Sequence, residues 1–339
     1  MLIIFSHTQD YGPLAFDPYL WAAVAIWSFD RFVRIVRWVY CNIHVNTKHL
    51  VTTKANAIYN EEADIIILKI SPGAQHLKPG PSQHYFIYQY NTWRGWENHP
   101  FSLASWNESS TPSNFELQTV TIEGTKSEYD TEAPPSPSTA SQLSTNDGQE
   151  LTFYLRPLKG FTGRLRKQCL GQTEPVPLRL LLEGPYGHPF SAHTYDTLIL
   201  VAGGSGIAGV LAYLRKHDKG SQTTRIRLIW AAKQVSMIDE IVRRENIQES
   251  DIAVQTSLFV TGHNQALESD GNDHKIQVKG GRPNIMALVS EEVRQTGQQR
   301  TAVVACGPPG MADETRACVH TLLLEGFKRV EYVEESFGW

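Results

Sequence analysis

The feature that most constrains the fold is a run of glycines directly after an apolar strand. Residues 197–202 read Thr-Leu-Ile-Leu-Val-Ala, and Gly204, Gly206 and Gly209 follow with the spacing G-x-G-x-x-G before a helical pattern that runs to Leu214. Glycines at this spacing let the backbone approach a pyrophosphate, and the helix N-terminus supplies free N–H groups. The pattern predicts a phosphate-binding strand–turn–helix unit; the alternative is a glycine turn without a ligand.

The region after residue 195 alternates apolar strands with helical stretches. Strands are expected at 197–202, 225–231, 254–260 and 301–306, and helices around 236–247, 284–296 and 309–324. Such alternation implies a parallel sheet covered on both faces. We therefore expect an α/β nucleotide-binding domain over 195–339.

The region from 45 to 190 has a different sequence pattern, in which short strands are separated by Pro and Gly turns. Strands are expected at 64–70 and 83–90, near Leu103, and at 152–156 and 178–182. No helix-length pattern interrupts them, so this region predicts a small antiparallel β-barrel. The length of 339 residues agrees with about two domains.

A Ser/Thr/Pro-rich acidic stretch lies inside this barrel region, at 106–149. It has too little apolar surface to offset the entropy lost on ordering. We expect it to be a disordered insertion in a loop.

Residues 1–44 contain an aromatic and aliphatic segment at 21–40 with Arg31, Arg34 and Arg37 at intervals of three. A basic amphipathic helix of this kind suits an anionic membrane surface. The alternative is a helix packed on the next domain with a solvated arginine edge. Because no run of about 18 apolar residues occurs, a complete membrane span is not expected. The apolar start suggests a chain whose membrane part lies upstream.

The composition and the motifs of the chain exclude several classes of function. The net charge is −4, with 31 Lys+Arg and 35 Asp+Glu, which argues against a nucleic-acid partner. The four cysteines are scattered without a C-x-x-C pair, so neither a disulfide framework nor a zinc site is expected. A G-x-S-x-G elbow and metal-ligand spacing of the H-x-x-x-H kind are also missing. We predict no metal site.

Two cations favour NADPH over NADH. An Asp or Glu normally meets the NAD ribose at the end of the second strand, but here the strand ends in Lys233. Arg282 supplies a second cation in a Gly-Arg-Pro-Asn turn. The alternative for either residue alone is a surface charge.

Four further segments have the character of ligand loops. Cys306-Gly-Pro-Pro-Gly follows an apolar strand, where ligands of open α/β sheets sit; a buried cysteine acting as a small hydrophobe is equally expected there. The barrel region contains 98–105 (Asn-His-Pro-Phe-Ser-Leu-Ala-Ser), 156–164 with Arg156 and Lys159, and 184–187 (Gly-Pro-Tyr-Gly). None of these is diagnostic alone.

In this order, the motifs resemble the cytosolic half of the ferric reductase and NADPH oxidase superfamily, which is similar to ferredoxin–NADP reductase. The matching segments are 99–102, 159–162, 184–187, 203–206, 281–284, 306–309 and the tail 334–339. Residues 25–34 also resemble the segment by which fungal ferric and cupric reductases leave their last membrane helix. The resemblance implies a flavin-binding barrel followed by an NADP-binding α/β domain.

Site residues follow from the resemblance by position. It implies that FAD is bound by His99, Pro100, Phe101, Ser102, Arg156, Lys159, Gly160 and Thr162, with Ser102 near flavin N5. It implies that NADPH is bound by Gly203, Gly204, Ser205, Gly206, Lys233, Arg282, Cys306, Gly307 and Pro308, with Cys306 near the nicotinamide. Trp339, with Phe337, would cover the flavin ring. The implied catalytic residues are Ser102, Cys306 and Trp339.

The implied activity is a ferric or cupric chelate reductase that passes a hydride from NADPH to FAD and then single electrons toward haem or metal, in metal ion uptake. Two alternatives stay open: a superoxide-producing oxidase, and a catalytically silent nucleotide-binding regulatory module. Family members carry an upstream haem domain, which is missing here. We therefore expect either a fragment or truncated product or a chain that uses a separate membrane haem partner, on the cytosolic face of the plasma membrane.

Overall fold

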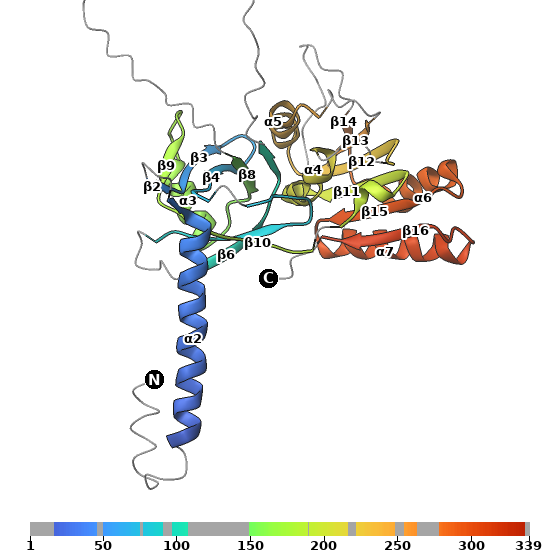
Figure 1. The fold of residues 1–339 in the computed structure, drawn as a ribbon. Coiled ribbons are helices and arrows are strands. Elements are labelled where there is room, and N and C mark those ends of the chain that lie inside the picture. The colour runs from blue at the N-terminus through green and yellow to red at the C-terminus, as the bar shows by residue number, and fades with distance from the viewer. Residues whose placement is uncertain are drawn as a thin grey trace, which may run out of the picture.

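The computed structural model describes residues 17–45, 50–74, 77–90, 97–107, 149–188, 190–215, 222–247, 254–262 and 278–335. Nearly all of the predicted acidic insertion lies outside the described residues, as do Phe337 and Trp339. Figure 1 shows a first body of antiparallel strands beside a second body of parallel strands and helices. This arrangement confirms the predicted fold class; the domain boundaries at 45–190 and 195–339 stay predictions.

Two antiparallel sheets form the first body. The larger has the order β7-β8-β4-β3-β9, and the smaller has the order β10-β5-β6. Their strands are β3 (Lys54–Asn60), β4 (Ile65–Ser71), β5 (His84–Tyr88), β6 (Asn98–Ser102), β7 (Ser105–Asn107), β8 (Glu150–Leu155), β9 (Val176–Leu178) and β10 (Leu181–Tyr186). A short hairpin of β1 (Ile43–Val45) and β2 (Leu50–Thr52) precedes them.

One helix, α3 (Phe161–Cys169), interrupts these strands, so the expectation of an all-strand region was wrong. Its buried residues are Phe161, Leu165 and Cys169, which share one face at intervals of four. They close the core that the two sheets enclose, together with residues such as Ile66 and Phe153. The helix was missed because a single face of three residues gives a short signal.

A six-stranded parallel sheet forms the second body, in the order β14-β13-β12-β11-β15-β16. Its strands are β11 (Thr197–Gly203), β12 (Arg225–Ala232), β13 (Val254–Val260), β14 (Val278–Gly280), β15 (Thr301–Cys306) and β16 (Val330–Glu334). Helices α4 (Ile207–Arg215) and α5 (Val235–Glu245) pack on one face, and α6 (Ile285–Thr296) and α7 (Pro309–Leu324) on the other. Short 3₁₀ turns occur at Ala192–Thr194 and Gly204–Gly206.

Strand β4 explains how the two bodies join. Its residues Ile65 to Leu68 are all buried, because alternate side chains serve two cores. Ile66 and Leu68 face the core of the first body, whereas Ile65 and Ile67 pack against helices of the second. A strand that is covered on both faces has a continuous run of apolar residues, and β4 has such a run from Ile65 to Leu68.

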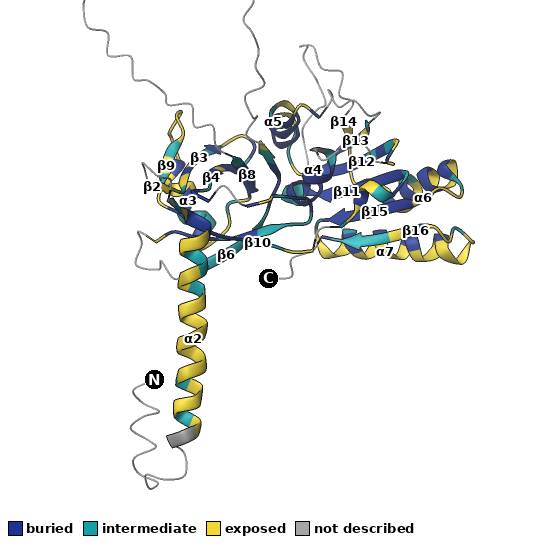
Figure 2. Cartoon of the chain, viewed as in Figure 1, coloured by how far each residue is buried: buried dark blue, intermediate teal, exposed yellow. Residues whose placement is uncertain are grey.

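Helix α2 (Asp17–Asn42) projects from the first body (Figure 1). Only its last turns are anchored: the Trp38 indole Nε1 donates to Glu183, and the Asn42 amide exchanges hydrogen bonds with backbone Leu182. The rest of the helix is mostly exposed (Figure 2). Among the described residues, no helix is long and apolar enough to cross a membrane.

The three arginines of this helix differ in their surroundings. Arg31 and Arg34 both pair with Asp30 of the same helix. Arg34 also lies close to Tyr88 of the body. Arg37 lies against the body, with its guanidinium 4.2 Å from the centre of the Tyr186 ring and its Nε 3.8 Å from Glu183. The basic edge of the helix is therefore partly neutralised, and its C-terminal part is used for docking.

Candidate functional site

The order of the parallel sheet places the candidate nucleotide site. The chain runs outward from β11 through β12, β13 and β14 and then returns to β15 on the other side of β11. The connections therefore reverse direction between β11 and β15, and ligands of open α/β sheets bind at the carboxyl ends of strands at such a point. Gly203 to Gly206 follow β11 there, and Cys306 to Pro308 follow β15, with Ala202 paired to Cys306.

These two loops touch through positions that have no side chain. A methyl group on Gly206 would lie 2.3 Å from the carbonyl oxygen of Cys306, and one on Gly203 would lie 2.5 Å from the Pro308 ring. On the other side, nothing lies within 4 Å of the space beside Gly204. The glycines thus close the loops against each other and leave the outer side of the turn open, which fits a dinucleotide pyrophosphate.

Trp230 fixes the shape of the glycine turn and was missed by the sequence analysis. Its ring is completely buried on β12, and its Nε1 donates to the carbonyl oxygen of Gly204 at 3.1 Å. This hydrogen bond fixes the glycine turn from the side of the sheet, and the opposite side of the turn stays open. No local pattern could have found this contact, because the two residues belong to different strand–loop units.

Cys306 lies behind the two loops beside a buried hydrogen bond. Its side chain is 8% exposed, and burial, reinforced by the negative charge of Glu335, raises the pKa of its thiol to about 12. The Tyr213 hydroxyl donates to Glu335 at 2.6 Å, and burial together with this carboxylate raises the pKa of Tyr213. Cys306 is therefore a neutral thiol that serves as an apolar contact and not as a nucleophile. Tyr213 is a further residue that the sequence did not indicate, and Glu335 lies in the matched tail, where the sequence analysis assigned it no role.

The two predicted phosphate-binding cations share one edge of the sheet. Lys233 follows β12 and Arg282 follows β14, and both side chains are exposed. The end of β13 lies between them, because the Gly262 N–H donates to the Lys233 carbonyl oxygen at 3.1 Å and the Gly281 N–H to Val260 at 2.8 Å. The fold thus brings both cations to the ligand edge, on alternate strands.

The candidate flavin residues of the first body centre on β6. His99 stacks on Phe161 with ring centroids 4.9 Å apart and lies beside Phe101 at 6.4 Å. Its Nε2 is buried without a hydrogen-bond partner, and desolvation lowers the pKa of this histidine. Pro100, Phe101 and Ser102 are half-buried along the same strand. A buried nitrogen without a partner fits a site whose ligand supplies the missing hydrogen bond.

The loop before α3 forms the second part of this site. Arg156, Lys159 and Gly160 are exposed, and the helix begins after Gly160 without a side-chain cap. The Thr162 hydroxyl accepts from the Leu158 N–H at 2.9 Å, which fixes the loop. Uncapped N–H groups beside two cations fit an anionic diphosphate.

Arg164, which the sequence analysis did not assign, completes this surface. It pairs with Glu97 at 2.7 Å and lowers the pKa of His99, as desolvation does, whereas Glu97 raises it. The pair joins α3 to the start of β6 and so holds the two flavin segments together. The signal was present in the sequence as the arginine that ends the 156–164 loop.

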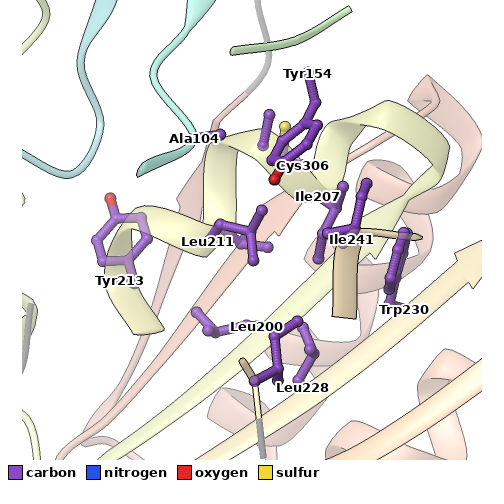
Figure 3. Packing of buried hydrophobic residues seen from close by; sticks show 14 of the residues in the cluster. Ala104, Tyr154, Leu200, Ile207, Leu211, Tyr213, Leu228, Trp230, Ile241 and Cys306 are labelled. Carbon is purple, nitrogen blue, oxygen red and sulfur yellow. The ribbon is translucent and has the colours of Figure 1, made fainter. Parts of the chain in front are cut away.

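The two halves of the site meet at the joint core. Ala104, two residues beyond Ser102, and Tyr154 of β8 lie in the same buried cluster as Cys306, as Figure 3 shows. Residues next to the candidate flavin segments therefore share one buried cluster with the first residue of the β15 loop. Among the described residues, no group of His, Cys, Asp or Glu is placed to hold a metal ion.

Comparison with known sequences agrees with this geometry. Residues 195–320 match the model of the ferric reductase NAD-binding domain. Over 95% of its length, the chain is 27% identical to ferric reductase transmembrane component 3 of Saccharomyces cerevisiae, and over 99% it is 25% identical to a probable ferric reductase transmembrane component of Candida albicans.

Nearly the whole length of the chain is therefore similar to fungal ferric reductases. The resemblance stated from its motifs is thereby confirmed. The chain spans 43% and 47% of these two ferric reductases, so it corresponds to less than half of each.

Solved structures confirm the two-body fold. A ferredoxin NADP+ reductase from Neisseria gonorrhoeae with bound FAD and NADP superposes with a TM-score of 0.51 at 14% identity, covering 84% of this chain and 98% of that one. A cytochrome P450 reductase from Amycolatopsis gives 0.50 at 14% identity, with 86% and 72% covered. At this identity the likeness speaks for the fold alone.

Proposed function

We propose that the chain is the FAD- and NADPH-binding half of a ferric or cupric chelate reductase. Residues 45–190 would bind FAD and residues 195–339 NADPH. The observation that carries the proposal is the buried cluster in which Ala104 and Tyr154, which lie next to the candidate flavin segments, are joined with Cys306 of the β15 loop. A nucleotide alone would require only the second body.

The residues of the chain would have distinct roles. When bound, FAD would take a hydride, which is two electrons and a proton, from NADPH and give the two electrons singly to haem or to a chelated ferric or cupric ion. His99, Phe101 and Ser102 would line the flavin, with Thr162 and Arg156 at its diphosphate. Gly203 to Gly206 would hold the NADPH pyrophosphate, and the neutral thiol of Cys306 would pack near the nicotinamide. Alignment and exclusion of water need no general base from the protein.

Lys233 and Arg282 would select NADPH. Both cations lie at the carboxyl edge of the sheet beyond the glycine turn, where the adenosine end of a bound dinucleotide extends. A 2′-phosphate gains charge-assisted hydrogen bonds there. The uncharged ribose diol of NADH would form weaker hydrogen bonds with these two cations.

The exposed face of α2 supports attachment to a membrane. Large apolar side chains cover most of the helix: Tyr19, Trp21, Ile26, Trp27, Phe29, Phe32, Val33, Ile35, Val36, Val39 and Tyr40. At 100° per residue, Arg31 and Arg34 occupy the opposite side from Phe29 and Phe32. An amphipathic helix of this composition lies in a bilayer interface. We place the protein at the cytosolic face of the plasma membrane, near a membrane haem domain that is upstream or separate.

The central test uses the purified 339-residue chain loaded with FAD and kept free of oxygen. Mixing with NADPH should bleach the visible flavin absorbance, and adding ferric citrate should restore it with release of ferrous ion. A chain that stays colourless after FAD is added would support the silent regulatory module instead. Superoxide formed in air at the expense of ferric reduction would support the oxidase.

Membrane attachment is tested separately by flotation with anionic phosphatidylserine vesicles. The chain should float, and the double variant Phe29→Ser, Phe32→Ser should remain with the soluble fraction. Leu324→Ser is the matched control, because Leu324 is 76% exposed on α7, far from the helix in sequence. Equal flotation of the double variant would remove α2 from the attachment.

A further inference from the structure

The contact between the two bodies is an apolar seam. Ile65, Ile67, Ala104 and Tyr154 of the first body pack in one buried cluster with helices α4 and α5 of the second. Figure 3 shows Tyr154 above α4, close to Ile207 and Ile241. Apolar packing of this kind resists separation but specifies orientation weakly, since it has no direction.

One carboxylate is buried at this seam. Glu245 is the last residue of α5 and is 8% exposed. Its Oε1 accepts from the Ser105 hydroxyl at 2.9 Å and from the Tyr154 hydroxyl at 2.5 Å, and both donors belong to the first body. A buried carboxylate is costly without hydrogen bonds, and bonds to an ionised acceptor are strong and directional. The pair of bonds therefore gives the seam a defined geometry.

The first turn of the same helix supplies a second contact. The Ser236 hydroxyl donates to the Glu62 carbonyl oxygen in the β3–β4 turn at 2.6 Å. Ser236 and Glu245 lie nine residues apart, or about 14 Å along the helix axis at 1.5 Å per residue. Two polar contacts at the ends of one helix prevent the bodies from rotating about either contact alone.

The segments that Glu245 joins are those that carry the candidate cofactor residues. Ser105 follows Ser102 by three residues, and Tyr154 precedes Arg156 by two. On the other side, α5 begins two residues after Lys233. Glu245 thus connects both flavin segments to the helix that follows the second nucleotide strand.

We propose that Glu245 is a positioning residue that sets the distance between bound flavin and bound nicotinamide by hydrogen-bonding Ser105 and Tyr154 across the seam. This inference rests on the proposed function. Glu245 is not one of the candidate cofactor-binding residues and acts through the two hydroxyls. Because hydride transfer requires close approach of the reacting atoms, a small rotation at the seam slows it while leaving each separate pocket intact.

The test compares Glu245→Gln and Tyr154→Phe with Glu240→Gln in the full chain. Glu240 is a matched control, because it lies on the same helix at the same 8% exposure and pairs with Arg243 and Arg244 of its own helix. In anaerobic stopped flow, Glu245→Gln should lower the limiting rate of flavin reduction by about tenfold. The NADPH concentration at half-maximal rate and the FAD content should stay at the wild-type values. Glu240→Gln should leave all three unchanged.

A second measurement does not depend on activity. Hydrogen exchange of the cofactor-free chain should quicken at 61–64, 105–107 and 150–155 in Glu245→Gln and Tyr154→Phe, and not in Glu240→Gln. If the rate and the exchange in both variants equal those of the wild type, Glu245 does not position the bodies, although the proposed function stands. If the wild type itself shows no flavin reduction by NADPH, the proposed function fails, and the exchange result alone decides whether Glu245 holds the seam.

Discussion

The two halves of the candidate site are held together by different kinds of contact. In the nucleotide half, the loops after β11 and β15 meet backbone to backbone, and a methyl group at Gly206 would collide with the Cys306 carbonyl oxygen at 2.3 Å. In the flavin half, side chains make the contacts: His99 stacks on Phe161, and Arg164 pairs with Glu97. At Gly203 and Gly206 the first half leaves no room for an added atom, whereas the second half can lose one side chain and keep its others. Substitutions should therefore act sharply in one half and gradually in the other.

The largest effect is expected for Gly206→Ala. The added methyl group must push the two loops apart, and such overpacking costs about 1–3 kcal/mol of unfolding free energy. Displacing the loops by even about 1 Å should slow flavin reduction by NADPH roughly 100-fold. Stopped-flow absorbance and thermal unfolding measure the two consequences.

Gly310→Ala is the control for this substitution. It follows the same β15 loop, but a methyl group there meets nothing within 4 Å. Its rate and its melting temperature should equal those of the wild type. If both variants lose rate and melting temperature equally, the close approach of the two loops is not the cause of the loss.

Lys233→Ala is expected to show the next largest effect, on cofactor choice. Losing a charge-assisted hydrogen bond to the 2′-phosphate should raise the KM for NADPH about tenfold. The KM for NADH should not change, because NADH lacks this phosphate. Steady-state kinetics with both nucleotides give the ratio, and Lys328→Ala, another exposed lysine, should leave it unaltered. A parallel rise in both KM values would count against a phosphate contact.

His99→Ala tests the flavin half. Loss of the stacked ring should weaken FAD binding by up to about tenfold, in the range measured for aromatic pairs, without preventing folding. Titration of the quenching of flavin fluorescence gives the affinity. His193→Ala, a substitution of an exposed histidine in a 3₁₀ turn, should bind FAD as the wild type does. A complete loss of FAD in His99→Ala would show that this half is as intolerant as the nucleotide half.

The same contrast explains what the sequence could predict. The glycine turn, the Cys306 loop and the strands β11, β12, β13 and β15 were predictable, because backbone constraints leave local patterns of glycine, proline and apolar runs. Helix α3 was missed, although Phe161, Leu165 and Cys169 at intervals of four were the available signal.

The contacts made by side chains across the fold were not predictable. Trp230 meets Gly204, Tyr213 meets Glu335, and Glu245 meets Ser105 and Tyr154 only because the sheets bring distant segments together. A single sequence contains no periodicity that pairs such residues. Features of the site that depend on local backbone patterns can therefore be predicted from the sequence, whereas contacts between distant side chains are seen only in the structure.

The smallest effect is expected in the pH dependence of stability. Desolvation lowers the pKa of His99 below its ordinary value of 6.5, so the folded chain holds this ring neutral at pH values where the unfolded chain protonates it. The unfolded state then binds more protons, and the free energy of unfolding falls as the pH drops below 6.5. The neutral ring contributes its full share of stability above that value.

Urea unfolding of the FAD-free chain at pH 7.5 and pH 5.5 measures this fall. It should be smaller in His99→Gln, which cannot titrate, and unchanged in His193→Gln. His84 also has a pKa lowered by desolvation, so part of the fall should persist in His99→Gln and become smaller still in the double variant with His84→Gln. A fall in His99→Gln equal to that of the wild type would show that the ring is solvated, and the flavin half would then lack the buried nitrogen that distinguishes it from the nucleotide half.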